Sequence, residues 1–169
     1  LKINLGCHEG ADGIVFGLQP NSTSVGGVGG GIGFAGIKPS LGVEFDTYQN
    51  GWDPYYDHIA IIKNGDVDHT TSNTLAGPVN ANGKDIEDCK YHIVRMTWDA
   101  QIFQFKVYFD CIEKLIYKGD IVKNIFNNDP FVYWGFTSGT GSEKNDHRVC
   151  LTYTSFLDKM KDTTICLGS

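Results

Sequence analysis

The chain has 169 residues, of which 41% are hydrophobic and 12% aromatic, and this suits one globular domain with a sizeable core. Its formal net charge is -6, which argues against nucleic acid or an anionic membrane as a partner, because both are bound through a basic face. Apolar runs are also too short for membrane insertion.

Short apolar segments alternate with turns rich in glycine and asparagine, which is typical of strands. The predicted strands cover residues 1–5, 13–18, 41–47, 58–62, 91–98, 102–109, 114–117, 132–136 and 149–156. Residues 91–98 and 102–109 flank a short Asp-Ala-Gln turn and predict a β-hairpin. Helical periodicity is almost absent, apart from a short turn near residues 119–127. The pattern predicts an all-β sandwich or barrel, with residues 1–169 forming a single domain.

Five cysteines lie far apart in the sequence, without a CxxC pair that would indicate zinc or a redox centre. Disulfides formed in an oxidising compartment are the better interpretation, and an odd number leaves one thiol over. Buried free thiols in a cytosolic protein are the alternative.

Two carboxylates predict a cation site at the end of the strand 41–47. Residues two apart on a strand share a face, so Glu44, Asp46 and the start of the loop at Tyr48 point the same way. Carboxylates on one face repel each other unless a positive charge lies between them. The alternative for these two residues is a solvated strand edge followed by an acidic turn.

The following loop supplies further metal ligands in Asn50, Asp53, Asp57 and His58. Oxygen ligands suit calcium, whereas carboxylates mixed with imidazole suit manganese or a similar transition ion. We therefore predict two adjacent metal ions, bridged by Asp46 and Asp53. His69, His92 and His147 are interpreted as surface or hydrogen-bonded residues.

Residues 44–59, which read E-F-D-T-Y-Q-N, then W-D-P, then H-I, resemble the metal-binding segment of legume (L-type) lectins. The resemblance implies calcium together with manganese or another transition ion in an adjacent site. The implied manganese ligands are Glu44, Asp46, Asp53 and His58. The implied calcium ligands are Asp46, Tyr48 through its carbonyl, Asn50 and Asp53. The loops after Asn50 and Asp53 are shorter than in the plant pattern, which affects the transition-metal site more than the calcium site.

Three further segments, residues 10–13, 29–33 and 135–143, resemble the sugar-binding loops of this family. The resemblance implies that Asp12, after a cis peptide bond, accepts from sugar hydroxyls. Asn50 and the Gly30 N–H would donate, and the Tyr48 ring, with Trp52, would stack on the sugar. Specificity would come from the variable loop that includes Gly141 and Ser142.

The resemblance covers essentially the whole chain. The amino-acid sequence is most similar to bacterial secreted members of the family. The resemblance implies a concanavalin-like jelly-roll β-sandwich of antiparallel sheets. Because the Ala-Asp-Gly motif comes so early, the first strands of the sandwich are expected to lie outside this chain. It implies a secreted or cell-surface lectin that binds mono- or oligosaccharides, with an oligomer as one open possibility.

Two other functions remain as alternatives. One is a calcium-stabilised structural or adhesion module of a larger surface protein. The other is a glycoside hydrolase of the same sandwich class, which needs a second carboxyl group as acid/base. In the hydrolase pattern E-x-D-x-x-E that third position is Gln49 here, and glutamine cannot exchange a proton. We therefore expect no enzymatic activity.

Overall fold

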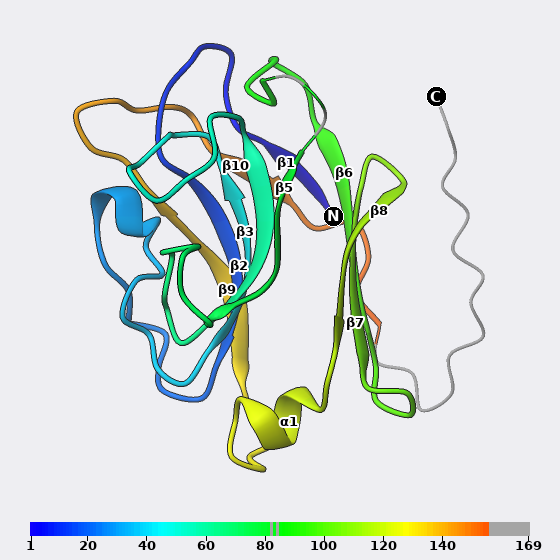
Figure 1. Ribbon diagram of the computed structural model, residues 1–169. Coiled ribbons are helices and arrows are strands. Elements are labelled where there is room, and N and C mark those ends of the chain that lie inside the picture. Colours follow the sequence, from blue (N-terminus) through cyan, green and yellow to red (C-terminus); the bar gives the residue numbers. More distant parts are fainter. Residues whose placement is uncertain (82, 84, 156–169) are drawn as a thin grey trace.

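The computed structural model describes residues 1–81, 83 and 85–155, which form two five-stranded antiparallel sheets (Figure 1). One sheet has the order β10-β1-β6-β7-β8 and the other the order β5-β4-β3-β2-β9. The strands are β1 (Lys2–Asn4), β2 (Gly13–Gln19), β3 (Leu41–Asp46), β4 (His58–Lys63), β5 (Thr74–Asn80), β6 (His92–Asp99), β7 (Gln104–Phe109), β8 (Ile112–Lys118), β9 (Tyr133–Gly139) and β10 (Arg148–Cys150). This arrangement confirms the predicted all-β sandwich.

The main core lies between the two sheets and follows from strand alternation. Ile14 of β2, Phe45 of β3 and Ile59 of β4 pack in this core with Phe109 of β7. The helix α1 (Ile121–Asn124) adds Ile121 to the same cluster and lies at one end of the sandwich (Figure 1).

A second, smaller cluster covers the outer face of the β5-β4-β3-β2-β9 sheet. Phe34, from the long segment between β2 and β3, packs there with Val15 and Ile62. Gly17 and Gly42 face each other on neighbouring strands beneath its ring. A Cβ on Gly17 would lie 2.8 Å from Phe34 Cε2, so the absence of side chains makes room for the phenyl ring.

We expect Gly42→Ala to destabilise the fold by about 1–3 kcal/mol, the usual cost of overpacking. The new Cβ would lie 2.7 Å from Phe34 Cε1 and 3.0 Å from Val15 Cγ1. Gly135→Ala in β9 is the matched control, because a Cβ there meets nothing within 4 Å. Urea unfolding of both variants checks the prediction, and equal midpoints would contradict it.

Most predicted strands are found within one or two residues, including the hairpin of β6 and β7. Two differ. The strand β5 was not predicted, because its sequence contains Gly77-Pro78, a pair that usually interrupts strands. The strand predicted over 149–156 is wrong in extent: β10 ends at Cys150, residues 151–155 are irregular, and residue 156 lies outside the described residues.

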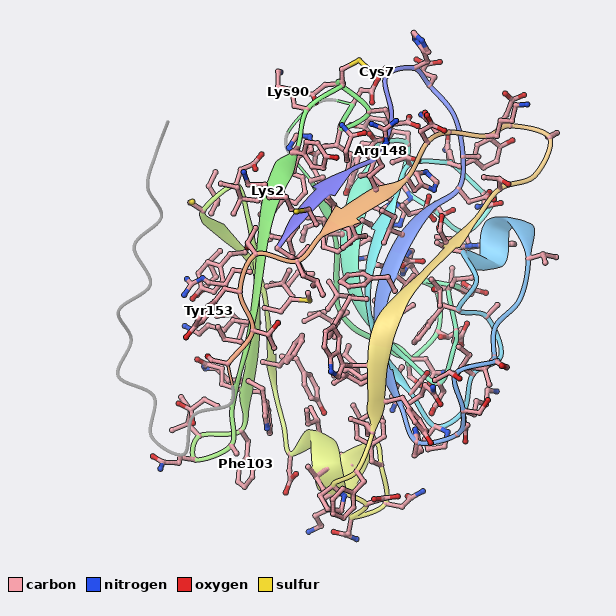
Figure 2. All side chains as sticks on the ribbon, turned by 180° about the vertical axis from the view of Figure 1, so that it is seen from behind. Lys2, Cys7, Lys90, Phe103, Arg148 and Tyr153 are labelled. Carbon is pink, nitrogen blue, oxygen red and sulfur yellow. A yellow bond between two sulfur atoms is a disulfide. The ribbon has the colours of Figure 1, made fainter. Side chains whose placement is uncertain are left out.

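The disulfide prediction is confirmed by a bond between Cys7 and Cys89, which joins the β1–β2 and β5–β6 connections. Figure 2 shows Cys7 and Lys90 at the same end of the molecule. Cys111 is also disulfide-bonded, and Cys150 is free and exposed. Cys166 lies outside the described residues. Within the described chain, no helix is long and apolar enough to cross a bilayer.

Candidate metal and carbohydrate site

Four connections meet at the end of the sandwich opposite α1 (Figure 1). They join β1 to β2, β3 to β4, β5 to β6 and β9 to β10, and they contain most of the predicted site residues. Strand order explains the gathering, since β2, β3 and β4 are adjacent and antiparallel. The start of β2, the end of β3 and the start of β4 therefore meet at one edge.

Glu44, Asp46 and His58 lie on the outer face of this sheet, as the alternation predicted. Asp46 is the register partner of both Gly13 and His58, and Glu44 pairs with Ala60. All three side chains are buried; Glu44 is 0% exposed and Asp46 2%. Three titratable groups in an apolar surrounding require compensation by hydrogen bonds or a counter-charge.

The loop after β3 is held by its own aspartates. Asp46 Oδ1 accepts the Tyr48 N–H at 2.7 Å, and Asp53 Oδ2 accepts the Asn50 N–H at 2.8 Å. The Asp53 N–H in turn donates to the Asn50 carbonyl at 3.2 Å. These bonds leave Asp53 Oδ1 to face the histidines of the site.

His69 joins the cluster, and sequence reasoning missed it. Its Nε2 lies 2.8 Å from His58 Nε2, 3.2 Å from Glu44 Oε2 and 3.7 Å from Asp53 Oδ1. His69 is therefore hydrogen-bonded, as one of the two interpretations held, but its side chain is 3% exposed and it does not lie at the surface; it belongs to a group that could hold a metal ion. The other two histidines agree with that interpretation, since His92 contacts Asp110 Oδ2 at 2.8 Å and His147 contacts Ser138.

The electrostatics of the cluster show a shortage of positive charge. Burial, followed by the charges of Glu44 and Asp53, raises the pKa of Asp46 to about 9. Burial also raises the pKa of Glu44 and of Asp53 and lowers the pKa of His58 to about 4. Burial alone would lower the pKa of His69, but the hydrogen bond and charge of Glu44, together with the charges of Asp53 and Asp68, outweigh it and the pKa is raised.

Several buried oxygens of the cluster fit a cation. Among the described residues, Glu44 Oε1 and Oε2, Asp53 Oδ1 and Asp12 Oδ2 accept no hydrogen bond of ordinary geometry. The donors form two overlapping groups whose ligand atoms lie within 4.8 Å of one another: Glu44, His58 and His69, and Asp46, Asp53 and His58. A pair of adjacent cations would compensate these carboxylates.

Asp57 lies outside this cluster, although the sequence predicted it as a metal-ligand candidate beside His58. It forms a separate group with Asp85 and Glu87, and its Oδ2 accepts the Ile86 N–H at 2.7 Å. Burial raises the pKa of Asp57 to about 6 and that of Glu87 to about 7. Neighbouring residues on a strand point to opposite faces, and Asp57 directly precedes His58 at the start of β4.

Three predicted sugar-binding residues lie around the cluster. The Ala11–Asp12 peptide bond is cis, as the resemblance implied, and Asp12 is 4% exposed. The Asp12 N–H donates to the Gly139 carbonyl at 2.9 Å, and its carbonyl accepts the Thr47 N–H at 3.1 Å. A Cβ on Gly30 would lie 3.0 Å from Asn50 Oδ1, so the Asn50 amide lies close beside the glycine loop, where a larger residue would crowd it.

The other predicted sugar contacts border this arrangement. Tyr48 and Trp52 are 38% and 41% exposed, so both rings can meet a ligand. Gly141 and Ser142 are exposed in the turn after β9, where the Gly141 N–H donates to the Glu143 carbonyl.

An acidic groove of about 680 Å³ adjoins the site at Tyr48 and Gln49. Five carboxylate residues line it: Glu9, Asp57, Asp85, Glu87 and Glu143. Its lining does not include Asp12, Gly30 or Asn50. The groove therefore lies beside the predicted sugar site and does not coincide with it.

Comparison with known proteins identifies the family. The legume lectin beta-barrel domain (L-type lectin domain) matches residues 1–153. A basic agglutinin of Psophocarpus tetragonolobus is 41% identical over 64 residues, which cover 36% of this chain and 26% of the agglutinin. A lectin-related protein of Cladrastis kentukea is 43% identical over 63 residues, 34% of this chain and 22% of that protein. The matched segment thus spans about a quarter of these relatives.

Solved lectin structures share the fold. The lectin from Bauhinia forficata in complex with GalNAc has a TM-score of 0.65 and 21% identity, covering 83% of this chain and 64% of that one. Lectin I-B4 from Griffonia simplicifolia, in its metal-free form, has a TM-score of 0.66 and 22% identity over 88% and 70% of the two chains. Basic winged bean lectin with Tn-antigen has a TM-score of 0.62 at 24% identity, over 83% and 59%.

These relatives are lectins and agglutinins, which supports the expectation of a domain without enzymatic activity. The two sequence relatives are plant proteins, so the predicted closeness to bacterial secreted members finds no support among them. The family match extends over both sheets and over the segments that carry Asp12, Gly30, Asn50 and His58. The chain belongs to the legume (L-type) lectin family.

Proposed function

We propose that this chain binds carbohydrate in a calcium-dependent manner, at the surface formed by Asp12, Gly30 and Asn50. The observation that carries the proposal is their arrangement around a buried carboxylate cluster. The Asn50 amide lies beside Gly30, where a Cβ would crowd it. The Asp12 carbonyl accepts the N–H of Thr47, the residue after Asp46, and Asp12 Oδ2 has no hydrogen bond among the described residues. Sugars are recognised by such convergent polar groups beside an apolar surface.

In this proposal each residue has one task. Asp12 Oδ2 accepts from sugar hydroxyls, and the Asn50 amide and Gly30 N–H donate. The half-exposed rings of Tyr48 and Trp52 contact the apolar face of the sugar. Gly141 and Ser142 in the exposed turn contribute to the choice of sugar.

The metal ions would position these groups without reacting. Calcium would be held by Asp46, Asp53, Asn50 and the Tyr48 carbonyl. Manganese, or another transition ion, would be held by Glu44, Asp46, Asp53 and His58. When bound, the ions supply the positive charge that lets buried carboxylates ionise, which fixes the loop that carries Asn50.

Of the two alternatives, the glycoside hydrolase has a physical argument against it. Glu44 is fully buried, so it cannot reach a glycosidic bond as a hydrolase nucleophile. A structural or adhesion module would need calcium without binding sugar. The disulfides support a secreted or cell-surface location. We also propose that residues 1–169 belong to one lectin domain, and that this domain can form an oligomer.

A glycan-array screen tests the proposal, run with calcium and manganese, then with EDTA, then with calcium restored. Two neighbouring structures contain GalNAc and Tn-antigen, so GalNAc-terminated glycans are the first probes. Binding that disappears with EDTA and returns with calcium is the expected result. Calcium that raises the melting temperature without any glycan binding would favour the structural module.

Asp12→Ala is expected to abolish glycan binding while the protein stays folded. Asp12 Oδ2 makes no hydrogen bond to the described residues, so the substitution removes a ligand contact and little else. Asp129→Ala is the matched control, because that exposed side chain follows α1, at the opposite end of the sandwich, and accepts the Phe131 N–H at 2.9 Å. Retained binding by Asp12→Ala would place the sugar elsewhere.

A further inference from the structure

The position of His69 carries an inference beyond the proposed site. This histidine lies in the connection between β4 and β5, outside every segment that resembles the family's ligand pattern. Its side chain is 3% exposed, and the side chains of Glu44 and Asp53 beside it are 0% exposed. Two imidazoles and two carboxylates therefore lie together in one solvent-excluded region at the outer face of β3 and β4.

The distances match a coordination shell. Four separations between ligand atoms are 2.8 Å (His58–His69), 3.2 Å (His69–Glu44), 3.7 Å (His69–Asp53) and 3.9 Å (His58–Asp53). Ligands at about 2.1 Å from one ion lie about 3.0 Å apart in octahedral and about 3.4 Å apart in tetrahedral geometry. The observed values bracket both.

Each histidine is also oriented as a metal ligand should be. His69 Nδ1 contacts the Thr74 hydroxyl at 3.2 Å, and His58 Nδ1 lies 3.4 Å from the Tyr56 carbonyl. Both Nε2 atoms are thereby turned toward Glu44 and toward each other. Metal-binding histidines commonly use the second ring nitrogen in this way, because such a contact fixes the ring and its tautomer.

We propose that His69 is a second imidazole ligand of the transition-metal site, together with Glu44, Asp46, Asp53 and His58, and that it shifts the preferred ion from manganese toward zinc or cobalt. Imidazole favours the later divalent metals, whereas carboxylate and water suit manganese. This inference deepens the metal part of the proposed function and rests on it. It concerns which ion is held, not which sugar is bound.

Direct metal titration tests the assignment. The protein is stripped with EDTA, dialysed into calcium, and titrated calorimetrically with Zn²⁺, Co²⁺ and Mn²⁺ salts. We expect the wild type to bind Zn²⁺ more tightly than Mn²⁺ by at least about 100-fold. His69→Ala should weaken Zn²⁺ binding by about 100-fold or more, since outer contacts of ligands alone commonly contribute about 10–100-fold. Mn²⁺ binding should change much less.

Two control variants separate ligation from other effects. His8→Ala removes an exposed histidine and should leave the titration unchanged. Thr74→Val removes the hydroxyl that contacts His69 Nδ1 and should weaken Zn²⁺ binding by about 10-fold, less than loss of the ligand itself.

A measurement on the wild type keeps the inference testable if His69→Ala fails to fold. X-ray absorption of the Zn²⁺-loaded protein should show scattering from two imidazoles, and one imidazole would overturn the proposal. It would also be overturned if His69→Ala binds Zn²⁺ like the wild type. Equal destabilisation of stripped and loaded protein would show instead that His69 acts as an ion-pair partner of Glu44. Sugar binding is assayed separately, so its failure with two imidazoles present would contradict only the proposed function.

Discussion

Removing the metal ions is expected to make stability fall with rising pH. In the chelated protein, the free energy of unfolding should fall as pH rises from about 6.5 to 9, whereas that of the metal-loaded protein should change little over the same range, because its carboxylates are ionised as they are in the unfolded chain. The difference follows from the raised pKa values of the carboxyl cluster, with Asp46 at about 9.

The sign follows from proton binding in the two states. In the unfolded chain an aspartate ionises near 3.8, but folded Asp46 keeps its proton up to about pH 9. The folded protein therefore binds more protons than the unfolded chain, and raising the pH favours unfolding. His69, whose pKa is raised, acts in the same sense above 6.5. His58, with its pKa lowered to about 4, opposes the trend only below 6.5.

The expected magnitudes are measurable. Between pH 6.5 and 9 the Asp46 carboxyl alone corresponds to about 3 kcal/mol, at about 1.36 kcal/mol per pKa unit. Bound ions require ionised carboxylates, so metal affinity rises with pH. Saturation at about 100–1,000 times the dissociation constant adds about 2.7–4.1 kcal/mol, or a melting temperature increase of roughly 5–15 °C for a domain of this size.

Urea unfolding at pH 6.5, 7.5 and 8.5, with EDTA or with calcium and manganese, checks this prediction. The two sets of unfolding free energies should diverge steadily with pH. Parallel curves would show that the carboxyl cluster holds no cation. A chelated protein whose stability rises with pH would show that the cluster ionises without one.

The candidate metal ligands on β3 and β4 could be predicted because their positions depend on local rules. Glu44 and Asp46 share a face through the two-residue period of a strand, and the loop that returns to His58 is short. The antiparallel register then brings Asp46 opposite His58. Nothing beyond strand alternation and a tight connection is needed to place these groups together.

His69 could not be predicted because its position depends on a strand that the sequence conceals. β5 contains a Gly-Pro pair and pairs with β4 through an irregular register between Ile59 and Ile62. Thr74, the first residue of that strand, contacts the His69 ring. With β5 unrecognised, the connection from β4 reads as an open turn and His69 as a surface residue.

Asp57 shows the opposite error. Its closeness to His58 in sequence made it a ligand candidate, yet it forms a separate acidic group with Asp85 and Glu87. The β5–β6 connection that supplies those two carboxylates is distant in sequence and is joined to the β1–β2 connection by the Cys7–Cys89 disulfide. Contacts of this kind follow from tertiary structure, which a local pattern does not encode.

Asp46→Asn is expected to stabilise the chelated protein and to abolish metal-dependent glycan binding. The asparagine Oδ1 can still accept the Tyr48 N–H that Asp46 Oδ1 accepts at 2.7 Å, so the loop keeps its local hydrogen bond. The amide carries no charge and needs no proton, which removes both the cost of burying a carboxylate and the repulsion with Glu44 and Asp53 that together raise the pKa of Asp46. Even one pKa unit avoided corresponds to about 1.4 kcal/mol, and we expect at least that gain at pH 7.5 in EDTA.

In the presence of calcium and manganese the order should reverse. The variant lacks the carboxylate predicted to bridge both ions, so its affinity for calcium should fall by at least about 100-fold and its stability should no longer respond to metal. Asp99→Asn is the matched control, because that partly exposed carboxylate accepts the Gln101 N–H at 2.9 Å in the β6–β7 turn, away from the cluster. Unfolding of both variants with EDTA and with calcium provides the measurement. If Asp46→Asn lowers stability equally in the two conditions, the carboxylate serves the fold directly, and a role in holding a cation is refuted.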